Sequence, residues 1–402
     1  MAGIFEGIKI LDFTNNVAGP CATANFADLG AEVIKVERPI AGDDSRGIAP
    51  RIEGQSLTFM WMNRGKESVV LNLTDPDALE IIYEMVKDVD VVVESFKPGM
   101  MKRHKLDYET LSKINPSIIY CSISVGGQTG GYSKMPGFDI IAQGMSGLMD
   151  LCGEPDGMPV KNGVTIGDYV AGGNAFGAIS AALFHRERTG EGQYIDISLL
   201  DGLIACNTTV ENAANLGANP TRSGAHHGTM APYGIYRGTH GQTVIIAAYT
   251  NGMWTRLCNA LGKPELIDHP DFNTVSLRLK NLPQLIEIIE GWLGQYEDIN
   301  DAIQIMTEAG VACCKIKSTK EVVNDPVLNE RGTFIELPTP PSLKEHKTIK
   351  TRGPAVRYSK TPAKASRSQD LGESNYKILE RYGWSREKID ELETKWEENA
   401  KK

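Results

Sequence analysis

Six short apolar runs, alternating with helical stretches, constrain the first two hundred residues of this chain more than any other feature. Three of these runs read AEVIKVE (31–37), VDVVVES (89–95) and SIIYCSIS (117–124). The other three read IKILDF, SVVLNL and QYIDISL and start at residues 8, 68 and 193. Near-continuous apolar strands are typical of a parallel sheet that helices bury on both faces. We therefore expect an α/β fold with a Rossmann-like, doubly wound large domain.

Helical stretches are predicted between these strands at 18–29, 76–87 and 108–113, followed by a longer helix at 168–188. In a sheet of this kind, ligands bind at the carboxyl ends of the strands. The dinucleotide fingerprint G-x-G-x-x-G does not follow the first strand, where the sequence reads LDFTNNVAGPCATANFADLG (11–30). A nicotinamide or flavin role therefore loses its main sequence support.

The pattern changes near residue 205, where a polar, glycine-containing stretch begins. We expect a large domain made of residues 1–205 and 330–402 and a small α/β domain at 225–325, because 402 residues are too many for one ordinary core. Residues 206–224 and 326–350 are expected to be linkers.

The small domain is predicted to open with a hairpin at 231–249, with its turn at Gly238–Gly241. Helices should follow at 252–261, 277–293 and 299–309. The polar C-terminal segment, which ends in two exposed helices, should pack back on the large domain, since it could not form a core by itself.

Charge and hydropathy exclude several kinds of partner. A formal net charge of −9 argues against nucleic acid, which requires a basic surface. No apolar run approaches the roughly 18 residues of a membrane-spanning helix, and the first segment, MAGIFEGIKILDF, carries an acid where a signal peptide would be basic. We expect a protein of the cytoplasm that does not associate with membranes.

The cysteines and histidines do not predict a metal site. The seven cysteines lack C-x-x-C spacing, and their odd number suggests reduced packing residues. His226 and His227 are adjacent, so their side chains point in different directions, and no further ligand type clusters with them. We therefore expect no bound metal.

One acidic side chain stands among small and apolar residues in GDYVAGGNAFGAISAAL (167–183). Asp168 opens the predicted helix, and the common role of Asp at such a boundary is to cap the first turn. A catalytic role is the alternative, and it requires support from elsewhere in the chain. A basic cluster in FKPGMMKRHK (96–105) leaves a similar choice between a solvated surface and an anion site.

Five ordered blocks together resemble the class III CoA-transferases, which include formyl-CoA:oxalate, carnitine and bile-acid CoA-transferases and the related acyl-CoA racemases. The resemblance covers nearly the whole chain. The blocks begin with GIKILDFTNNVAGP, VVVESFKPGMMKRHK, PGFDIIAQGMSGLM, GDYVAGGNAFGAIS and MAPYGIYRGTHGQ and lie at 7–47, 91–132, 136–149, 167–202 and 230–262.

The resemblance implies that Asp168 is a nucleophile that attacks an acyl-CoA thioester, forming a mixed anhydride and then an aspartyl-CoA thioester. Gly172, Gly173 and Ala175 would let the thioester approach the backbone. Asp139 stands where the family often has a second acid near the site. Coenzyme A is then a substrate, and no permanently bound cofactor is implied.

The resemblance also implies a coenzyme A site and an assembly. The nucleotide of coenzyme A would be bound by Arg38, Phe96, Lys97, Gly99 and Arg103. Val17 and Ala18 would lie near the thioester end of the ligand. The alternative to nucleotide binding is, for Arg38, a surface ion pair with Glu37 or Asp43. For Phe96, the alternative is a position in the hydrophobic core. Gly224 and Gly228 resemble the ends of a mobile active-site loop, or lie in a flexible linker. Two chains would form an interlocked homodimer.

Two departures narrow the expected reaction. The racemases carry a histidine where this chain has Phe138, and phenylalanine cannot exchange a proton. The oxalate enzymes carry glutamine where this chain has Val17, which suggests a less polar acid. We expect transfer of coenzyme A from an acyl-CoA donor to a free carboxylic acid. An acyl-CoA racemase or epimerase, or a non-catalytic CoA-binding subunit, remains as the alternative.

Overall fold

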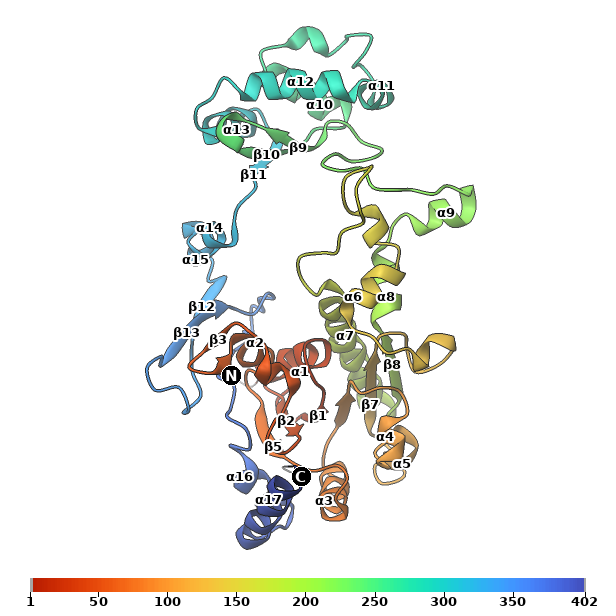
Figure 1. Cartoon of the computed structure of the whole chain (residues 1–402), viewed down its shortest axis with the longest axis vertical. Helices are drawn as coiled ribbons and strands as arrows, with labels where there is room; N and C mark the ends of the chain where they lie inside the picture. The colour runs from red at the N-terminus through yellow and green to blue at the C-terminus, as the bar shows by residue number, and fades with distance from the viewer. Residues whose placement is uncertain (1–2, 401–402) are drawn as a thin grey trace. The chain divides into compact units, whose positions relative to one another are not determined.

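The computed structural model describes residues 3–400, which form two compact units (Figure 1). Unit 1 contains the residues up to Leu148, Asn162–Thr208 and the residues from Val327 onward. Unit 2 contains Met149–Lys161 and Thr209–Pro326. The segment Met149–Lys161 thus groups with unit 2, although it precedes residue 205.

Unit 1 is built on a six-stranded sheet in which every strand pair is parallel. The sheet order is β5-β2-β1-β6-β7-β8, so the strands, counted along the chain, run 3-2-1-4-5-6 and the order reverses between β1 and β6. The six strands are β1 (Lys9–Phe13), β2 (Glu32–Glu37), β5 (Glu67–Val70), β6 (Val91–Glu94), β7 (Ile119–Ser124) and β8 (Tyr194–Ser198). The expected α/β class with a central parallel sheet is confirmed.

Burial differs among the strands of this sheet. The central strands β1 and β6 are almost fully buried, because helices cover both of their faces. In β8, at the edge, exposed residues alternate with more buried ones. The expectation that all six strands are buried on both sides is therefore wrong for β8, whereas β5, at the other edge of the sheet, is mostly buried.

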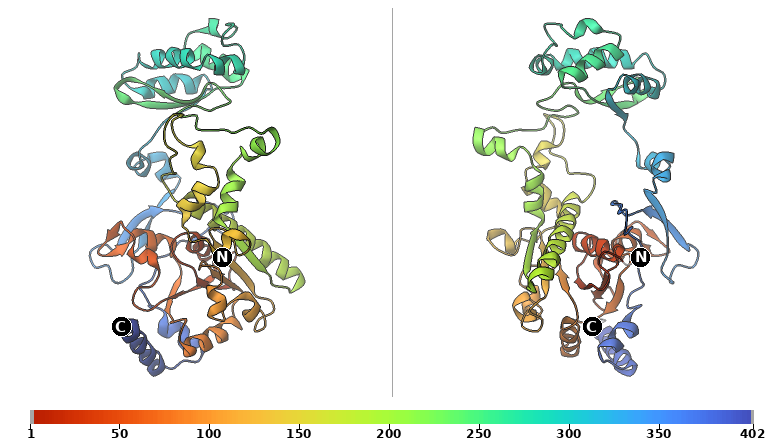
Figure 2. Two further views of the ribbon diagram at one scale, coloured as in Figure 1. Left: turned by 45° about the vertical axis from the view of Figure 1, so that its right-hand side comes forward. Right: turned by 180° about the vertical axis from the view of Figure 1, so that it is seen from behind.

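Helices pack on both faces of this sheet (Figures 1 and 2). Neighbouring strand residues belong to opposite cores. Ile10 faces the core built with α1 (Ala18–Asp28) and α7 (Ile166–Thr189). Leu11 faces the opposite core, built with α3 (Pro76–Val86) and the C-terminal helices. Those last helices are α16 (Asn375–Leu379) and α17 (Arg386–Ala400).

The C-terminal helices pack on unit 1, as the sequence predicts. Ile378, Leu379, Ile389, Leu392 and Trp396 are almost fully buried in the same core as Leu11. Burying this apolar row stabilises the segment despite its polar composition.

The remaining helices of unit 1 are short. They are α2 (Leu57–Met62), α4 (Met100–Arg103), α5 (Tyr108–Leu111), α6 (Asp139–Met145), α8 (Leu199–Cys206) and α15 (Pro326–Glu330). A small hairpin pairs β3 (Arg51–Ile52) with β4 (Gln55–Ser56).

The stretch 326–350 was expected to be a linker, but it contains most of a second hairpin. Strand β12 (Phe334–Pro338) pairs antiparallel with β13 (Thr348–Arg352). Apolar residues at Ile335, Leu337 and Ile349 pack this hairpin into a cluster with Trp61 of α2. This alternation of apolar residues is the signal that the sequence analysis overlooked.

Unit 2 has a three-stranded antiparallel sheet, ordered β11-β10-β9, and its own core. The predicted hairpin is present as β9 (Tyr233–Arg237) and β10 (Thr243–Ala247), and β11 (Ala312–Lys315) pairs with β10. The helix predicted at 277–293 is instead two helices, because Pro283 restarts the helix after Asn281. The helices are α9 (Val210–Leu216), α10 (Asn251–Ala260), α11 (Val275–Lys280), α12 (Leu282–Leu293), α13 (Ile299–Glu308) and α14 (Thr319–Val323).

Within residues 3–400, no helix has both the length and the apolar character needed to cross a bilayer.

Candidate functional site

Two loops meet at the point where the strand order of the sheet reverses. One follows β1 and leads through Thr14–Val17 into α1, and the other follows β6 and runs from Ser95 to Gly99. The backbone N–H of Asn15 donates to Ser95 Oγ at 2.9 Å, which ties the loops together. Parallel α/β sheets bind ligands at the carboxyl ends of their strands at such a reversal.

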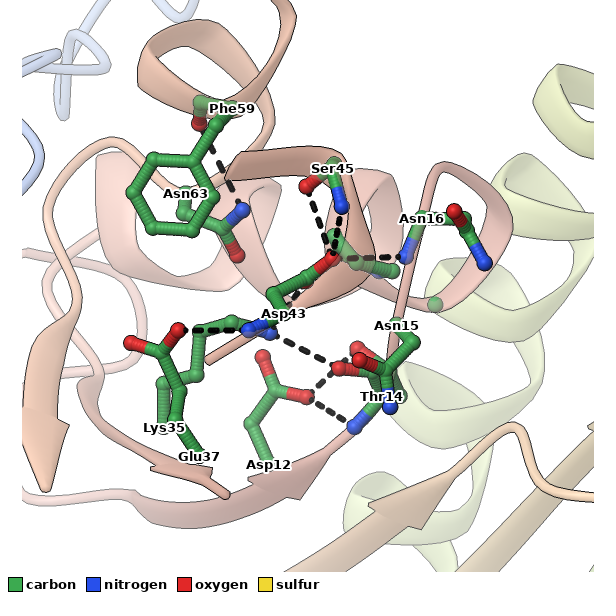
Figure 3. Close-up of polar contacts among 12 residues, drawn as sticks. Asp12, Thr14, Asn15, Asn16, Lys35, Glu37, Asp43, Ser45, Phe59 and Asn63 are labelled. Carbon is green, nitrogen blue, oxygen red and sulfur yellow. Dashed lines mark hydrogen bonds and ion pairs between the residues drawn. The ribbon is translucent and has the colours of Figure 1, made fainter. Parts of the chain in front are cut away.

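The first loop is held by a buried carboxylate. Asp43 Oδ1 accepts hydrogen bonds from the backbone N–H of Asn16 at 3.1 Å and from the backbone N–H of Ser45 at 2.7 Å (Figure 3). Its other oxygen lies 2.8 Å from the ammonium of Lys35, and both side chains are buried. Asn16 has a φ of 65°, an unusual left-handed conformation that these contacts maintain.

A second buried carboxylate, Asp12, holds the other side of the same loop. It accepts from the backbone N–H of Thr14 at 2.8 Å and from Lys66 Nζ at 2.9 Å. Lys35 Nζ donates to the Thr14 carbonyl at 2.8 Å. Burial alone would raise the pKa of Asp12, but the Lys66 and Lys35 charges outweigh it and lower that pKa. Two buried lysines and two buried carboxylates therefore fix the entry to α1.

Asp168 lies in the first turn of α7, but another residue caps that helix. Asp139, the first residue of α6, points its Oδ1 at the start of α7, where it accepts from the backbone N–H of Gly167 at 2.6 Å and of Asp168 at 3.3 Å. Its Oδ2 accepts from Gln143 Nε2 at 2.5 Å. The capping role that the sequence offered for Asp168 thus belongs to Asp139.

The Asp168 carboxyl group is partly buried beside Asp139. Burial, and then the Asp139 charge, raise the pKa of Asp168 to about 7, while a hydrogen bond with the Thr165 side chain lowers it. Desolvation and a like charge both disfavour the ionised form, and a poorly solvated carboxylate is a better nucleophile than a hydrated one. Both acids were named from the sequence, and in the structure the Asp139 carboxylate lies at the start of the helix that carries Asp168.

Helix α7 packs closely on the start of α1. A Cβ atom at Gly172 would lie 2.8 Å from the Ala18 carbonyl oxygen and 3.1 Å from the Cys21 Cβ. Gly172 therefore allows contact between two helices, and Ala175 is a core residue, so neither lines an open surface. Gly173 is exposed, so of the three it is the one open to a ligand.

Four side chains that the sequence analysis did not single out surround the Val17–Asp168 region. Cys21, Trp61 and Tyr169 belong to one apolar cluster with Val17 and the β12–β13 hairpin. Arg352, which ends β13, donates from Nη2 to Tyr169 Oη at 2.7 Å. Burial raises the pKa of the Cys21 thiol, which keeps it protonated and disfavours it as a rival nucleophile.

The residues predicted to bind the nucleotide follow strands β2 and β6. Phe96 is partly buried against a core cluster, and its N–H donates to the buried carboxyl of Glu94 at 2.8 Å. Lys97 and Arg103 are exposed, and within residues 3–400 neither has an ion pair, whereas Lys102 pairs with Glu109.

Two further nucleotide candidates have clear local roles. Gly99 has a φ of 83° and starts α4, a conformation that favours glycine. Arg38 is exposed and pairs with exposed Asp44. The alternative pairing of Arg38 with Glu37 or Asp43 is wrong, because Arg46 occupies Glu37 and Lys35 occupies Asp43.

The two glycines predicted for a mobile loop are in unit 2, not in unit 1 with Asp168. The Gly224 N–H donates to the Gly153 carbonyl at 3.0 Å, and its φ is 65°. His226, between the two glycines, forms a β-bridge with Gly234. The role of Gly224 and Gly228 as a lid stays a prediction.

One group in the described part of the chain has the ligand spacing of a metal site, namely Glu53, Glu345 and His346. The Glu53 carboxylate already accepts hydrogen bonds from the backbone N–H groups of Lys344, Glu345 and His346, at 2.6, 3.0 and 2.8 Å. Contacts with His346 and these N–H groups hold the pKa of Glu53 at about 2. This carboxylate anchors a turn.

Comparisons with known proteins show which proteins this chain resembles. Residues 5–374 match the family model described as CoA-transferase family III. A succinyl-CoA:glutarate CoA-transferase of Mus musculus is 40% identical over 88% of this chain and 80% of its own length. An acetyl-CoA:oxalate CoA-transferase of Acetobacter aceti is 37% identical over 83% of this chain and 86% of its own. The crystal structure of a CAIB/BAIF family protein from Brucella suis is 34% identical, with a TM-score of 0.83 over 95% of this chain and 100% of that chain.

Proposed function

Because this chain belongs to CoA-transferase family III, we propose that it transfers coenzyme A from an acyl-CoA thioester to a free carboxylic acid through a covalent intermediate on Asp168. The observation that carries the proposal is the carboxyl of Asp168, with its raised pKa, in the first turn of a helix that Asp139 caps. The cap fixes the helix start without using the Asp168 oxygens, so they can react.

The proposed chemistry begins when the Asp168 carboxylate attacks the thioester carbonyl carbon. The C–S bond breaks, and the products are a mixed anhydride and the thiolate of coenzyme A. The thiolate then attacks the Asp168 carbonyl carbon of the anhydride, releasing the donor acid as its carboxylate and leaving an aspartyl-CoA thioester.

The acceptor acid reverses these steps. Its carboxylate attacks the aspartyl-CoA carbonyl, expels the thiolate and forms a second anhydride. The thiolate attacks the acceptor's carbonyl carbon in this anhydride, which gives the new acyl-CoA and restores the Asp168 carboxylate. Each attack passes through an oxyanion that backbone N–H groups would stabilise.

We place the coenzyme A nucleotide along the loops that follow β2 and β6. The exposed Lys97 and Arg103 offer positive charge to phosphate groups, and Arg38 would exchange its Asp44 partner for a phosphate. In the loop after β6, Phe96 packs against the core and Gly99 provides the left-handed turn before α4. At the other end of the ligand, Val17 and Ala18 would approach the thioester, since the Ala18 carbonyl lies against the Asp168 helix at Gly172.

For the acid, we propose a dicarboxylic acid. The names of the two relatives above specify succinyl-CoA with glutarate and acetyl-CoA with oxalate, and both acceptor acids, glutarate and oxalate, are dicarboxylic acids. The apolar Val17 side chain, which suggested an acid less polar than oxalate, is compatible with a dicarboxylic acid whose two carboxylates are separated by methylene groups.

We propose further that the active form is an interlocked homodimer. Unit 1 is assembled from three separate stretches of chain, so the polypeptide leaves it and returns to it twice. Exposed apolar side chains on unit 1, such as Phe138 and Phe184, would be covered by a second chain.

A trapping experiment tests the covalent step. The enzyme is incubated with succinyl-CoA without acceptor, quenched with hydroxylamine and digested, and mass spectrometry should find the hydroxamate on the peptide that contains Asp168. The Asp168→Asn variant should give no label and no transfer. A labelled peptide elsewhere, or an Asp168→Ala variant with a rate within about tenfold of the parent, would show that another group is the nucleophile.

A further inference from the structure

A guanidinium group in unit 1 is exposed close to the start of α7. Arg352 Nη2 donates to the hydroxyl of Tyr169, which directly follows Asp168. Within residues 3–400, no carboxylate forms an ion pair with Arg352, whereas the nearby Arg64 pairs with Asp28. Arg352 therefore retains donors that could bind an anion.

Aromatic rings hold this guanidinium in place. Its central carbon lies 4.9 Å from the centre of the Trp61 ring and 5.6 Å from that of Tyr169. Such contacts stabilise a cation and restrict its side chain without using its hydrogen-bond donors. The strand that carries Arg352 is fixed by pairing with Phe334, and the hairpin is packed in the cluster that contains Trp61 and Tyr169.

The guanidinium and the Asp168 carboxylate share one neighbour. The Cys21 thiol feels both charges, since its pKa is raised by burial, lowered by Arg352 and raised by Asp168. Cys21 and Val17 lie in the same apolar cluster as Trp61 and Tyr169. The Arg352 guanidinium and the Asp168 carboxyl thus both act on a residue of the apolar cluster that contains Val17.

We propose that Arg352 determines specificity by binding the second carboxylate of a dicarboxylic acyl group whose thioester carbonyl faces Asp168. This inference rests on the proposed function, since it assumes that the thioester reaches Asp168. A carboxylate would accept two parallel hydrogen bonds from the planar guanidinium, and Tyr169 would keep that group oriented. The methylene groups of the substrate would pass along the apolar side, near Val17.

Specificity then follows from charge. A monocarboxylic acyl group of the same length would place a methyl group against Arg352 and gain no ion pair. The enzyme should therefore distinguish acyl-CoA substrates by the group at the end of the acyl chain opposite the thioester carbonyl.

The test measures binding apart from turnover. In the Asp168→Asn background, where the anhydride cannot form, calorimetry gives the dissociation constants of glutaryl-CoA and of pentanoyl-CoA, which have the same chain length. We expect glutaryl-CoA to bind about tenfold more tightly or better, and Arg352→Gln to abolish this preference while leaving pentanoyl-CoA binding unchanged. Arg352→Lys should retain part of the preference, because it keeps the charge but loses the paired donors.

Arg386→Gln is the control, since Arg386 is also an exposed arginine stacked on a ring, Tyr376, but belongs to the C-terminal helix α17. It should leave both dissociation constants unchanged. Equal binding of the two ligands by the parent, or a preference that survives Arg352→Gln, would overturn the assignment. If the parent enzyme, with Asp168 intact, transferred no coenzyme A while the binding preference was present, the proposed function would be contradicted and the assignment of Arg352 would stand.

Discussion

At the scale of single residues, the neighbouring Asp168 and Asp139 carboxyls determine how the reaction depends on pH. Burial and the charge of Asp139 raise the pKa of Asp168 to about 7, and only the carboxylate can attack a thioester. We predict that kcat/KM for acyl-CoA rises with pH and levels off above about 7. Initial rates between pH 5 and 9 check this. A rate that is flat over this range, or falls as pH rises, would contradict a nucleophile with this pKa.

The same raised pKa has a consequence for stability. Between the unfolded value of 3.8 and about 7, the folded chain keeps a proton on Asp168 that the unfolded chain has lost. The contribution of Asp168 to stability therefore falls as pH rises through this window, and above it the buried charge costs free energy. Asp168→Asn cannot ionise, so at pH 8 it should be more stable than the parent by on the order of 1 kcal/mol.

Thermal unfolding at pH 5 and pH 8 measures this difference, which should shrink at the lower pH. Asp156→Asn, at an exposed acid in unit 2, serves as the control and should change little at either pH. An Asp168→Asn variant with the same stability gain at both pH values would exclude ionisation of Asp168 as its cause.

At the scale of elements, the close contact of α7 with α1 connects the nucleophile to the loop after β1. We predict that Gly172→Ala destabilises the fold by about 1–3 kcal/mol, because its Cβ would lie 2.8 Å from the Ala18 carbonyl oxygen. It should also slow transfer, because the start of α1 would move relative to Asp168. Denaturant unfolding and initial rates measure the two effects.

Gly177→Ala on the same helix isolates the packing effect. Among residues 3–400, no atom outside its immediate chain surroundings lies within 4 Å of a Cβ built at Gly177. Both substitutions gain similar helix propensity, so Gly177→Ala should be neutral or stabilising. If the two variants have equal stability, the contact with α1 is not tight.

Elements whose signal is local were predictable from the sequence. All six parallel strands, and the helix that carries Asp168, follow from the spacing of apolar residues along the chain. The cap that Asp139 provides to Gly167, and the contact of Arg352 with Tyr169, join residues far apart in sequence. Such contacts depend on how elements pack, and the periodicity of each element by itself carries no information about them.

At the scale of the whole molecule, we predict a stable dimer. Light scattering should give about twice the 43.9 kDa mass of one chain. If the two chains interlock, tagged and untagged dimers mixed under native conditions should not exchange over hours, because separation requires unfolding. Mixing after denaturation and refolding is the control and should give hybrids. Hybrids within minutes under native conditions would rule out interlocking, and a monomer mass would rule out the dimer.

The return of the C-terminal helices to the first sheet has a consequence for synthesis. Trp396 is buried in a core with strand residues from the first quarter of the chain, and its indole N–H donates to Asp75 at 2.8 Å. A ribosome adds about 5–20 residues per second, so the early strands wait for ten seconds or more before these helices emerge. During that time the part of this sheet face that α3 does not cover is exposed to water and to other chains. A chaperone that shields apolar surfaces should therefore raise the yield of folded enzyme.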